Sequence, residues 1–395
     1  MLTGRKILIG ITGSIAAYKV PLIVRQLIKL GAEVKVLMTP AAKDFVSTLT
    51  LSTLSKNPVL TDLFDEQSWA NHVMLGRWAD LFVIAPLSVN TLSKMANGQC
   101  DNLLLATYLS ATCPVIVCPA MDEDMWLHQS TKKNIGKLKE VGCTIMNVAH
   151  GELASGLTGE GRMAEPEAII SFINQFFVNA EQLKGKKAIV TAGPTYEPID
   201  PVRFIGNHSS GKMGIAVAEE LSRRGAEVTL IKGPTPNGNL SHGSIKVIDV
   251  VTASEMYKAC TDVDFDIAVM AAAVADYTPE SVADKKIKKE ESGLQIHFRK
   301  TADILASLGK NKKNGQILVG FALETNNEEE NALKKLKDKK ADLMVLNSLN
   351  DIGAGFKSDT NKITIFYKDG KKKEYELKSK SAVAHDIVDS IIELL

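Results

Sequence analysis

GRKILIGITGSIAAYK, residues 4–19, decides the fold of the first half of the chain. A basic pair, Arg5 and Lys6, precedes the apolar run 7–11, and a turn rich in glycine and hydroxyl groups follows it. This order predicts a buried β-strand, a tight turn and an amphipathic helix. The run resembles a signal-peptide core, but it is too short and too often interrupted by glycine to span a membrane. We therefore expect a β-α start here.

GKKAIVTAG, residues 185–193, repeats this opening in the second half. Each opening leads through a helical stretch to a second apolar run, LIKLGAEVKVLMT at 27–39 and LSRRGAEVTLIKG at 221–233. Two β-α-β starts indicate two parallel sheets. Residues 1–180 hold only 15 of the 47 basic and 15 of the 46 acidic residues, so charge density rises midway. The sequence thus predicts two doubly wound, Rossmann-like α/β domains, 1–180 and 181–395.

Further apolar runs complete the two predicted sheets. In the first domain we expect strands at 81–85, 115–118 and 144–148, a closing helix at 166–177 and a linker at 178–187. In the second domain we expect strands at 188–191, 228–231, 245–249, 267–270, 317–321 and 343–346. Thr252 and Glu255 predict a capping box before a helix that ends near Cys260. Asp369-Gly370 predicts a hairpin, and hence an antiparallel sheet edge, before a final helix.

The overall composition excludes some classes of function. A formal net charge of +1 gives no field that would draw the protein to nucleic acid or to anionic membranes. The cysteines have neither metal-ligand spacing nor the density of a disulfide framework, which indicates a reducing compartment. We therefore expect a cytoplasmic protein. The five cysteines are Cys100, Cys113, Cys118, Cys143 and Cys260.

The first strand-to-helix turn is suited to a phosphate. It offers two hydroxyl groups, Thr12 and Ser14, where the free N–H groups of a helix start would point at an anion. Thr39 stands where a dinucleotide site has an acidic residue for a ribose, so the pattern favours a mononucleotide such as FMN over NAD. Glycine also serves such turns through its backbone freedom alone, and a plain connection stays open.

Three later segments follow predicted strands, at the edge where doubly wound sheets bind ligands: Asn71-His72, residues 86–90 and residues 119–126. With these segments, residues 1–180 resemble the flavin-dependent cysteine decarboxylases, the phosphopantothenoylcysteine decarboxylase branch in particular. The resemblance implies a flavodoxin-like domain that binds FMN. The cofactor-binding residues it implies are Gly10, Thr12, Gly13, Ser14, Thr39, Ser88 and Asn90.

The resemblance also implies a mechanism. FMN would oxidise the substrate thiol to a thioaldehyde, whose conjugation accepts electrons as CO2 leaves, and the reduced flavin would then return a hydride. His72 would be the base, a role that suits a side chain titrating near neutrality. The segment around Asp122 would grip the substrate carboxylate, and residues 151–166 would form a lid in which Arg162 meets substrate charge. A solvated loop stays the alternative for the lid.

Two residues depart from the pattern of that family. Asp122 stands where many members have asparagine, and Ser155 stands where many have a cysteine that protonates the enethiolate. A serine hydroxyl is a far weaker acid than a thiol, whose pKa is about 8.5. We expect Asp122 to be protonated in the complex, because two neighbouring carboxylates repel. We expect a water held by the lid, through Ser155, to deliver the proton.

The second half carries its own candidate site. Residues 191–214 form a loop far longer than usual between a strand and a helix, and it ends in NHSSGKMG, suited to a phosphate or an oxyanion. Ordinary helix capping stays open for this cluster. With AAAVAD at 271–276, GFALET at 320–325 and ALKKLKDKKAD at 332–342, this half resembles the phosphopantothenate-cysteine ligases.

Such ligases activate a carboxylate as an acyl-cytidylate with CTP, and the cysteine amine then displaces CMP. The resemblance places Asn207 on the acyl-cytidylate with Arg203 nearby, while magnesium would bridge phosphates. Ala302 departs from the family's proline. The resemblance places Ala272, Ala273, Asp276, Asp303 and Phe321 around the cytidine, and Lys286, Lys335 and Lys339 on the triphosphate.

Together the two resemblances follow the order of the bifunctional enzymes of coenzyme A synthesis. Similar proteins form homo-oligomers, with trimeric contacts at the flavin domain and dimeric contacts at the ligase domain, and we expect the same here. Two rival interpretations stay open. One is a flavoprotein reductase with a nucleotide-binding regulatory half, and the other is a flavin-binding regulator without catalysis.

Overall fold

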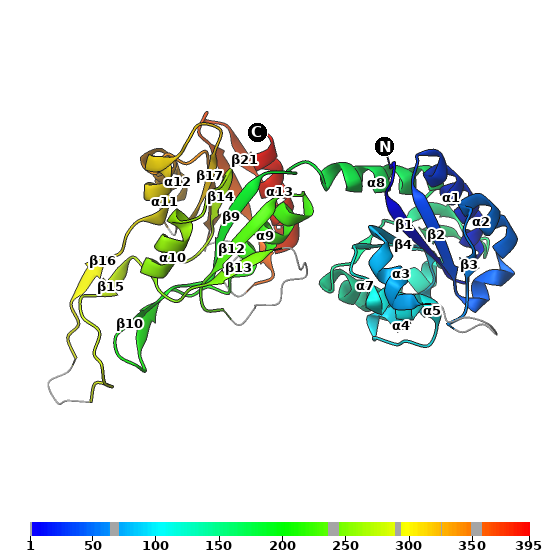
Figure 1. The fold of residues 1–395 in the computed structure, drawn as a ribbon, viewed down its shortest axis with the longest axis horizontal. Helices are drawn as coiled ribbons and strands as arrows, with labels where there is room; N and C mark the ends of the chain where they lie inside the picture. Colours follow the sequence, from blue (N-terminus) through cyan, green and yellow to red (C-terminus); the bar gives the residue numbers. More distant parts are fainter. Residues whose placement is uncertain (1, 64–70, 236–244, 289–293, 325, 349–357) are drawn as a thin grey trace. The chain divides into compact units, whose positions relative to one another are not determined.

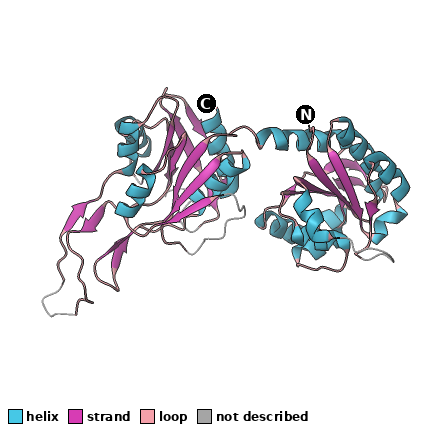
Figure 2. Ribbon diagram, viewed as in Figure 1, coloured by secondary structure: helices cyan, strands magenta, loops and turns pink. Residues whose placement is uncertain are grey.

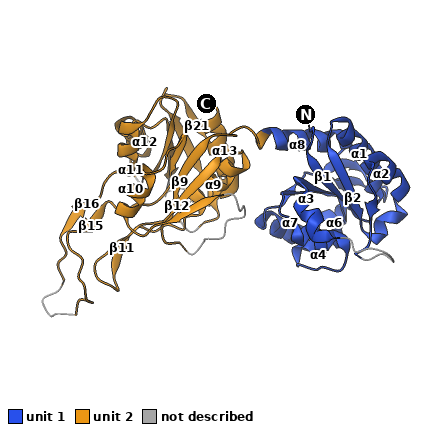
Figure 3. Ribbon diagram, in the orientation of Figure 1, with its two compact units in different colours: residues 1–178 blue, residues 179–395 orange. Residues whose placement is uncertain are grey.

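The computed structural model describes residues 2–63, 71–235, 245–288, 294–324, 326–348 and 358–395. The chain forms two compact units, Met1–Val178 and Asn179–Leu395, which Figure 3 shows in different colours. Each unit is a doubly wound sheet with helices on both faces (Figure 2). In the described part of the chain, no helix is long and apolar enough to cross a membrane.

The first unit contains a parallel sheet with the strand order β3-β2-β1-β4-β5-β6. This confirms the predicted flavodoxin-like sheet. The order reverses between β1 and β4, and the carboxyl ends of strands at such a reversal form the usual ligand crevice. The last strand is shorter than predicted, and β3 has no counterpart in the prediction. The strands are β1 (Lys6–Ile11), β2 (Glu33–Met38), β3 (Val59–Leu60), β4 (Leu81–Leu87), β5 (Val115–Pro119) and β6 (Thr144–Ile145).

Helices cover both faces of this sheet (Figure 1). The side chains of Ile7, Ile9 and Ile11 pack into one core, while Leu8 packs into the core on the opposite face. Because both faces are covered, the strand is continuously apolar rather than alternating. The helices are η1 (Ile15–Lys19), α1 (Val20–Lys29), η2 (Pro40–Asp44), α2 (Thr48–Ser55), α3 (His72–Trp78), α4 (Val89–Ala96), α5 (Leu103–Ser110), α6 (Glu123–Leu127), α7 (Gln129–Glu140) and α8 (Pro166–Asn179).

The predicted lid is an antiparallel hairpin of β7 (Ala149–Glu152) and β8 (Thr158–Arg162) rather than a loop. It is fastened to the segment around α6 by two hydrogen bonds, from Trp126 Nε1 to Glu160 at 3.0 Å and from Met121 N to the Gly161 carbonyl at 3.0 Å. Gly161 has a φ of 132°, and a Cβ there would lie 2.3 Å from the Met121 oxygen. Glycine is therefore needed for this close approach.

The second unit contains an eight-stranded sheet with the order β13-β12-β9-β14-β17-β18-β20-β21. The first six strands are parallel, whereas β20 and β21 pair antiparallel. This confirms the predicted antiparallel edge, with Asp369-Gly370 in the hairpin turn. The strands are β9 (Lys187–Ala192), β12 (Glu227–Lys232), β13 (Lys246–Asp249), β14 (Ile267–Met270), β17 (Ile317–Glu324), β18 (Leu343–Ser348), β20 (Ile363–Tyr367) and β21 (Lys372–Glu374).

Two apolar cores lie against the two faces of this second sheet. The predicted capping box is present, since Thr252 accepts from the backbone of Glu255 and the Glu255 carboxylate accepts from the backbone of Thr252. The helices are α9 (Lys212–Arg223), α10 (Ala253–Thr261), α11 (Ile304–Asn311), α12 (Glu328–Asp338) and α13 (Lys380–Ile392).

Short hairpins extend from the second unit where the sequence predicted only loops. The long loop 191–214 contains a hairpin whose strands are held together by the stacked rings of Tyr196 and Phe204, with centroids 3.9 Å apart. A second hairpin projects beside it, away from the sheet (Figure 1). The short strands are β10 (Tyr196–Pro198), β11 (Phe204–Gly206), β15 (Tyr277–Pro279), β16 (Phe298–Lys300), β19 (Thr360–Asn361) and β22 (Lys378–Ser379).

The second unit contains a buried network of charged side chains. Arg224 donates to Glu220 at 2.8 Å and to Asp389 at 2.6 Å, and His385 lies 3.1 Å from the same Glu220 carboxylate. Residues of the predicted linker take part, because Leu183 N donates to the Arg224 carbonyl and the Arg224 guanidinium donates to Gln182. The predicted linker therefore consists of the last turn of α8 and of residues packed on the second unit.

Candidate functional site

The first unit has a cavity of about 490 Å³ at the carboxyl ends of its strands. Hydroxyl and amide groups line it together with apolar side chains and with the charged pair Lys94 and Asp101. Thr39 Oγ1 is buried here without a hydrogen-bond partner in the described part of the chain, which indicates that a ligand completes it. The predicted cofactor residues that line the cavity are Gly13, Ser14, Thr39, Ser88 and Asn90.

Gly10 and Thr12 are buried and do not line this cavity. Thr12 Oγ1 donates to the Pro86 carbonyl at 2.7 Å and accepts from Ser88 N at 2.8 Å. It thereby joins the β1 turn to the start of α4. A Cβ at Gly10 would lie 2.9 Å from the Phe82 ring, so glycine lets the strand pack closely there. Thr12 therefore holds the turn by hydrogen bonds, and Gly10 allows the close packing of β1.

The three predicted catalytic residues of this half do not line that cavity. His72 begins α3 directly after Asn71, whose side chain accepts from Met74 N at 3.0 Å. Asp122 caps α6 by accepting from Glu123 N at 2.8 Å. Ser155 is exposed at the tip of the β7–β8 hairpin. Among the described residues, the predicted cofactor residues thus line a cavity that the predicted catalytic residues do not line.

Ion pairs through Glu165 link the end of the lid hairpin to η1. Lys19 is buried at the end of η1, and its amino group donates to Glu165 at 2.8 Å and to the Met163 carbonyl at 3.3 Å. Arg162, the last residue of β8, lies 3.2 Å from the same Glu165 carboxylate. The Lys19 hydrogen bond holds the pKa of Glu165 below its usual value. Arg162, predicted to meet substrate charge, is therefore engaged with Glu165 in this structure.

Two adjoining cavities lie at the carboxyl ends of the strands in the second unit, with volumes of about 480 Å³ and about 590 Å³. We name them the SSGK cavity and the Asp cavity. Ala272, Val274, Phe321 and Lys335 line both. The SSGK cavity is further lined by Asn207, Ser209, Ser210, Lys212, Ala273, Asn347, Asn361 and Lys380, among others, and the Asp cavity by Asp276, Asp303 and Lys339, among others.

Backbone hydrogen bonds hold the AAAVAD segment in place between these cavities. Ala272 N donates to Thr191 Oγ1 at 3.1 Å, Ala273 N to the Gly193 carbonyl at 2.9 Å, and Ala275 N to Thr195 Oγ1 at 2.9 Å. The small side chains leave the cavity walls open, so a flat ring can approach this backbone. That arrangement is suited to a nucleobase or a ribose.

The Asp cavity has a mixed charge. Lys339 donates to Asp303 at 2.6 Å, and Asp303 also caps α11 by accepting from Ala306 N at 2.8 Å. Burial alone would raise the pKa of Asp303, but these two hydrogen bonds outweigh it and keep the carboxyl ionised. Lys335 lies one helical turn before Lys339, the residue that follows α12, and both line the cavity.

Asn207 lines the SSGK cavity, and its side-chain amide donates to the Val274 carbonyl at 2.9 Å. Arg203 and Lys286 do not line either cavity. Arg203 pairs with Asp200 at 3.1 Å and donates to the Ile287 carbonyl at 3.2 Å, while Lys286 is exposed. Burial would raise the pKa of Asp200, but backbone N–H donors and Arg203 lower it.

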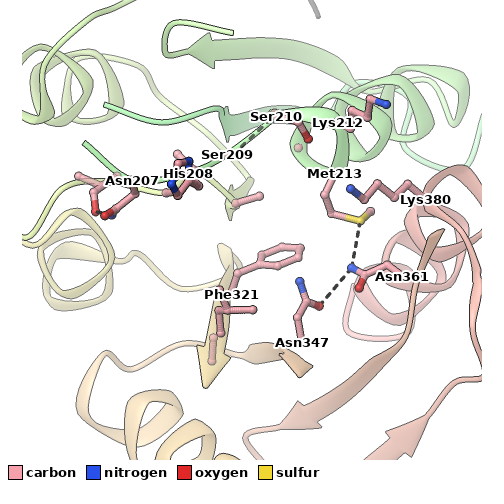
Figure 4. Close-up of a pocket in the computed structure, with 18 of the residues that line it drawn as sticks. Asn207, His208, Ser209, Ser210, Lys212, Met213, Phe321, Asn347, Asn361 and Lys380 are labelled. Atoms are coloured by element: carbon pink, nitrogen blue, oxygen red, sulfur yellow. Dashed lines mark hydrogen bonds between the residues drawn. The ribbon is translucent and has the colours of Figure 1, made fainter. Parts of the chain in front are cut away.

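Several lining residues were not predicted from the sequence. Asn347, Asn361 and Lys380 come from β18, β19 and the start of α13, and no local pattern marks them (Figure 4). Lys212 belongs to the NHSSGKMG cluster, where its charge was the available signal. Among the described residues, no group of three histidine, cysteine or acidic side chains lies placed to hold a metal ion.

Comparisons with known proteins match two separate families to the two halves of the chain. Residues 1–178 match the family model "Flavoprotein", and residues 183–395 match the model of the DNA/pantothenate metabolism flavoprotein C-terminal domain. The coenzyme A biosynthesis bifunctional protein CoaBC of Bacillus subtilis is 44% identical over 100% of this chain and 98% of its own length. The chain belongs to the CoaBC family. Its Vibrio vulnificus member is 42% identical over 100% of this chain and 99% of its own.

Members of the CoaBC family combine an N-terminal flavoprotein decarboxylase with a C-terminal ligase. The protein is therefore an enzyme of coenzyme A biosynthesis, a phosphopantothenoylcysteine synthetase and an FMN-dependent decarboxylase. This confirms the main interpretation of the sequence over its two rivals. A cysteine/cysteine sulfinic acid decarboxylase from an unknown prokaryotic organism is also similar, at 52% identity over 89% of this chain and 99% of its own.

A solved structure of the C-terminal domain of a CoaBC protein is 39% identical and covers 54% of this chain and 97% of its own, with a TM-score of 0.46.

Proposed function

We propose that residues 181–395 join 4'-phosphopantothenate to cysteine with CTP, and that residues 1–180 decarboxylate the product to 4'-phosphopantetheine with FMN. The observation that carries this proposal is the pair of adjoining cavities in the second unit. Seven residues predicted around CTP line these cavities, although they come from distant parts of the chain: Ala272, Ala273, Asp276, Asp303, Phe321, Lys335 and Lys339.

In this proposal the cytidine lies in the Asp cavity. The Asp303 carboxylate and Asp276 offer acceptors for the amino and hydroxyl groups of the nucleoside, and Phe321 offers a flat apolar surface. Lys335 lies at both cavities, so its charge meets the phosphates where the two join. Magnesium would bridge the CTP phosphates, since such sites commonly use few protein ligands.

Asn207 is suited to stabilise the acyl-cytidylate. Its amide donates to the Val274 carbonyl on the wall that the two cavities share, so it lies close to where an acyl phosphate would form. A donor aimed at developing negative charge lowers the barrier to acyl transfer. Arg203 is tied to Asp200 in the described residues, so its role in one chain is to hold the turn of the β10–β11 hairpin. Lys286 lies beyond the cavities, and its contact with the triphosphate stays a prediction.

In the first unit, Ser14, Thr39, Ser88 and Asn90 fit an FMN ligand, since they place hydroxyl and amide groups beside an apolar wall. When bound, FMN supplies the electron acceptor that decarboxylation of a cysteine carboxylate needs. The chain's own residues bind it, exclude water and orient the substrate. The β7–β8 hairpin covers α6 through Trp126 and Glu160, which supports its role as a lid.

Neither His72, the proposed base, nor Ser155, the proposed holder of a proton-delivering water, lines the cavity of the predicted FMN residues in one chain. This placement supports a site that is completed by another copy of the chain, as the proposed trimeric contacts require. Asp122 caps α6 from the position where the family often has asparagine. We infer that it is protonated when the substrate carboxylate lies beside it, because two adjacent carboxylates repel.

A second candidate substrate for the flavin half is free cysteine or its sulfinate. The observation in its favour is the 52% identity to a protein named for those two substrates. Asp122 and Ser155, which depart from the usual decarboxylase pattern, are where such a change of substrate would act. The proposed dimeric contacts of the ligase half and the cytoplasmic location are further parts of the proposal.

One assay tests both halves. The purified protein is expected to be yellow and to release pyrophosphate from CTP only when 4'-phosphopantothenate is present. Adding cysteine should then yield phosphopantothenoylcysteine, and its decarboxylation should yield 4'-phosphopantetheine and CO2. If pyrophosphate release does not depend on 4'-phosphopantothenate, the proposed ligase is wrong. If CO2 comes from free cysteine without CTP and never from phosphopantothenoylcysteine, the second candidate replaces the first.

A further inference from the structure

Lys19 is a buried lysine to which the proposed function gives no role. It is the last residue of η1 and is 5% exposed. Its amino group donates to the Met163 carbonyl at 3.3 Å and to the Glu165 carboxylate at 2.8 Å. Both partners lie in residues 163–165, directly after the β7–β8 hairpin, and we name this segment the lid root. A buried ammonium group is costly without such partners, so these contacts hold Lys19 against the lid root.

The short helix η1 joins Lys19 to the turn that carries predicted cofactor residues. Ser14 lines the cavity of the first unit, and its side chain caps η1 by accepting from Ala16 N. The Ser14 carbonyl also accepts from Ala17 N at 2.9 Å. The cavity wall and Lys19 therefore lie at the two ends of one short helical element. The contacts of Lys19 thus fix the lid root relative to the cofactor wall.

Glu165 connects Lys19 to the lid hairpin itself. One carboxylate oxygen, Oε1, accepts from Lys19 and also from Arg162 at 3.2 Å. Arg162 is the last residue of β8, and a Cβ at Gly151 would lie 2.8 Å from its Nη1 atom. The Arg162 side chain therefore lies close against β7, the other strand of the hairpin. Through Arg162, Glu165 is joined to both strands of the lid.

The hairpin lies in turn against the segment that contains Asp122. Met121 N donates to the Gly161 carbonyl at 3.0 Å, and Trp126 Nε1 donates to Glu160 at 3.0 Å. Asp122 is the residue proposed to meet the substrate carboxylate. A hairpin that is held at its root keeps β8 beside this segment, whereas a loosened hairpin would let the two separate.

We propose that Lys19 is a positioning residue of the decarboxylase half, which holds the lid closed over the substrate through Glu165 and Arg162. The inference rests on the proposed function for the identity of the substrate. When a substrate binds only under a closed lid, its apparent affinity falls in proportion to the closed fraction, while the reaction of bound substrate is unchanged. Loss of Lys19 should therefore act on substrate binding rather than on the chemical step.

The first test measures hydrogen exchange in residues 149–162 of the full, FMN-loaded chain. The variant Lys19→Met removes the charge but keeps a long apolar stem, and the Glu165 side chain that remains is half exposed and can be hydrated. We expect the lid amides to exchange about 10-fold faster, near the lower end for a lost charged hydrogen bond because Glu165 is half exposed. Glu165→Gln removes the same ion pair from the exposed side, so it should give a similar increase even if Lys19→Met folds poorly.

A double variant and a matched control make this test specific. Lys19→Met combined with Glu165→Gln should exchange no faster than the faster single variant, because both changes break one ion pair. Lys43→Met is the control, since Lys43 lies near the end of η2, the short helix after Thr39, and pairs with Asp62 at 3.4 Å rather than with the lid. It should leave lid exchange unchanged. Unchanged exchange in folded Lys19→Met and Glu165→Gln protein, an equal increase in Lys43→Met, or effects that add in the double variant overturn the proposal.

Steady-state kinetics separate positioning from a purely structural role. In Lys19→Met, the KM for phosphopantothenoylcysteine should rise about 10-fold while kcat stays within about threefold of wild type, and flavin absorbance should be unchanged. Lys19→Arg keeps the cation and should restore much of the affinity. Faster lid exchange with an unchanged KM would make Lys19 structural only, and a fall in kcat through lost flavin would place its role at the cofactor. Either result overturns the proposal.

Failure of this inference can be told apart from failure of the proposed function. If the wild-type chain decarboxylates phosphopantothenoylcysteine but its lid exchange does not depend on Lys19, the inference is wrong and the proposed function stands. If lid exchange depends on Lys19 but the wild-type chain releases no CO2 from phosphopantothenoylcysteine, the proposed function is wrong and the hold of Lys19 on the lid stands.

Discussion

The two halves bring their predicted residues together to different extents. In the second unit, seven residues predicted around the nucleotide line two adjoining cavities. In the first unit, five predicted cofactor residues line one cavity, while His72, Asp122 and Ser155 lie elsewhere. The residues predicted around the nucleotide thus line cavities within one chain, whereas the predicted catalytic residues of the decarboxylase do not line the cavity of its predicted cofactor residues.

The location of the residues explains this difference. The residues of the cofactor wall and of the two ligase cavities lie mostly at the carboxyl ends of strands or in the helix starts that follow them, which a doubly wound sheet gathers at one edge. His72 and Ser155 lie at the beginning of a peripheral helix and at a hairpin tip. A doubly wound fold gathers its strand ends at one edge, whereas groups on peripheral elements can lie away from that edge.

The largest expected effect is a loss of decarboxylation, which belongs to the first half alone. His72→Asn should leave FMN bound but lower CO2 release from phosphopantothenoylcysteine by about 100- to 10,000-fold, because a general base is lost while the cofactor wall is intact. Flavin absorbance and CO2 release measure the two properties, and the ligase rate serves as the internal control. Normal decarboxylation would show that His72 is structural.

The matching change in the second half is Asn207→Asp. Loss of one donor to developing negative charge costs about 100- to 1,000-fold in rate. The new carboxylate would also face the Val274 carbonyl and the acyl-cytidylate phosphate. Amide formation should therefore fall while decarboxylation of added phosphopantothenoylcysteine continues. Ligase turnover within about threefold of wild type would contradict the role of Asn207.

A smaller effect, on the rate of flavin reoxidation, is expected at the lid. Ser155→Ala should slow the return of flavin absorbance about 3- to 10-fold while CO2 release changes less, because the hydroxyl is proposed to hold a proton-delivering water. Single-turnover absorbance with product analysis separates the two steps. If the wild-type chain accumulates the oxidised enethiol and never completes the cycle, the flavin half is an oxidative decarboxylase only.

The smallest effect concerns stability of the second unit. The Glu220 hydrogen bond, with Asp389 nearby and opposed by burial and Arg224, raises the pKa of His385 above its usual 6.5. The stability that protonated His385 adds to the folded state is fully present below pH 6.5, and it is lost as the pH rises through the raised pKa. His385→Gln should flatten this dependence, by about 1 to 3 °C in the unfolding temperature because the ring is half exposed.

Calorimetry at several pH values measures it, with His297→Gln as a control on an exposed histidine of the same unit. Equal pH dependence in wild type and His385→Gln would remove His385 from the network's energetics.

The sequence predicted the sheets better than it predicted the connections. Strands such as 267–270 are continuous apolar runs, and their burial on both faces leaves a clear pattern. The three-residue strands β10, β11, β15 and β16 form through pairing with a partner rather than through their own periodicity. The β7–β8 hairpin escaped prediction because its glycines indicate a flexible loop as readily as a tight approach.

The site residues, too, include some that the sequence predicts and some that it does not. Ser14 and Asn207 can be predicted from the sequence because hydroxyl and amide groups cluster at a strand-to-helix turn. Asn361 and Lys380 carry no such signal, since each reaches the SSGK cavity only through the antiparallel return of the chain after β18. Their chemistry depends on burial, which one sequence does not display at an isolated polar position.

The contacts of Arg224 determine where this enzyme can be divided into separate halves. Leu183 and Gln182 bind Arg224, whose guanidinium is only 4% exposed and also serves Glu220 and Asp389. A gene for the ligase half that begins at residue 179 keeps these partners, whereas one that begins at residue 185 deletes them and opens a buried charge network to water. The isolated ligase therefore needs Gln182 and Leu183, which a cut at residue 185 would discard.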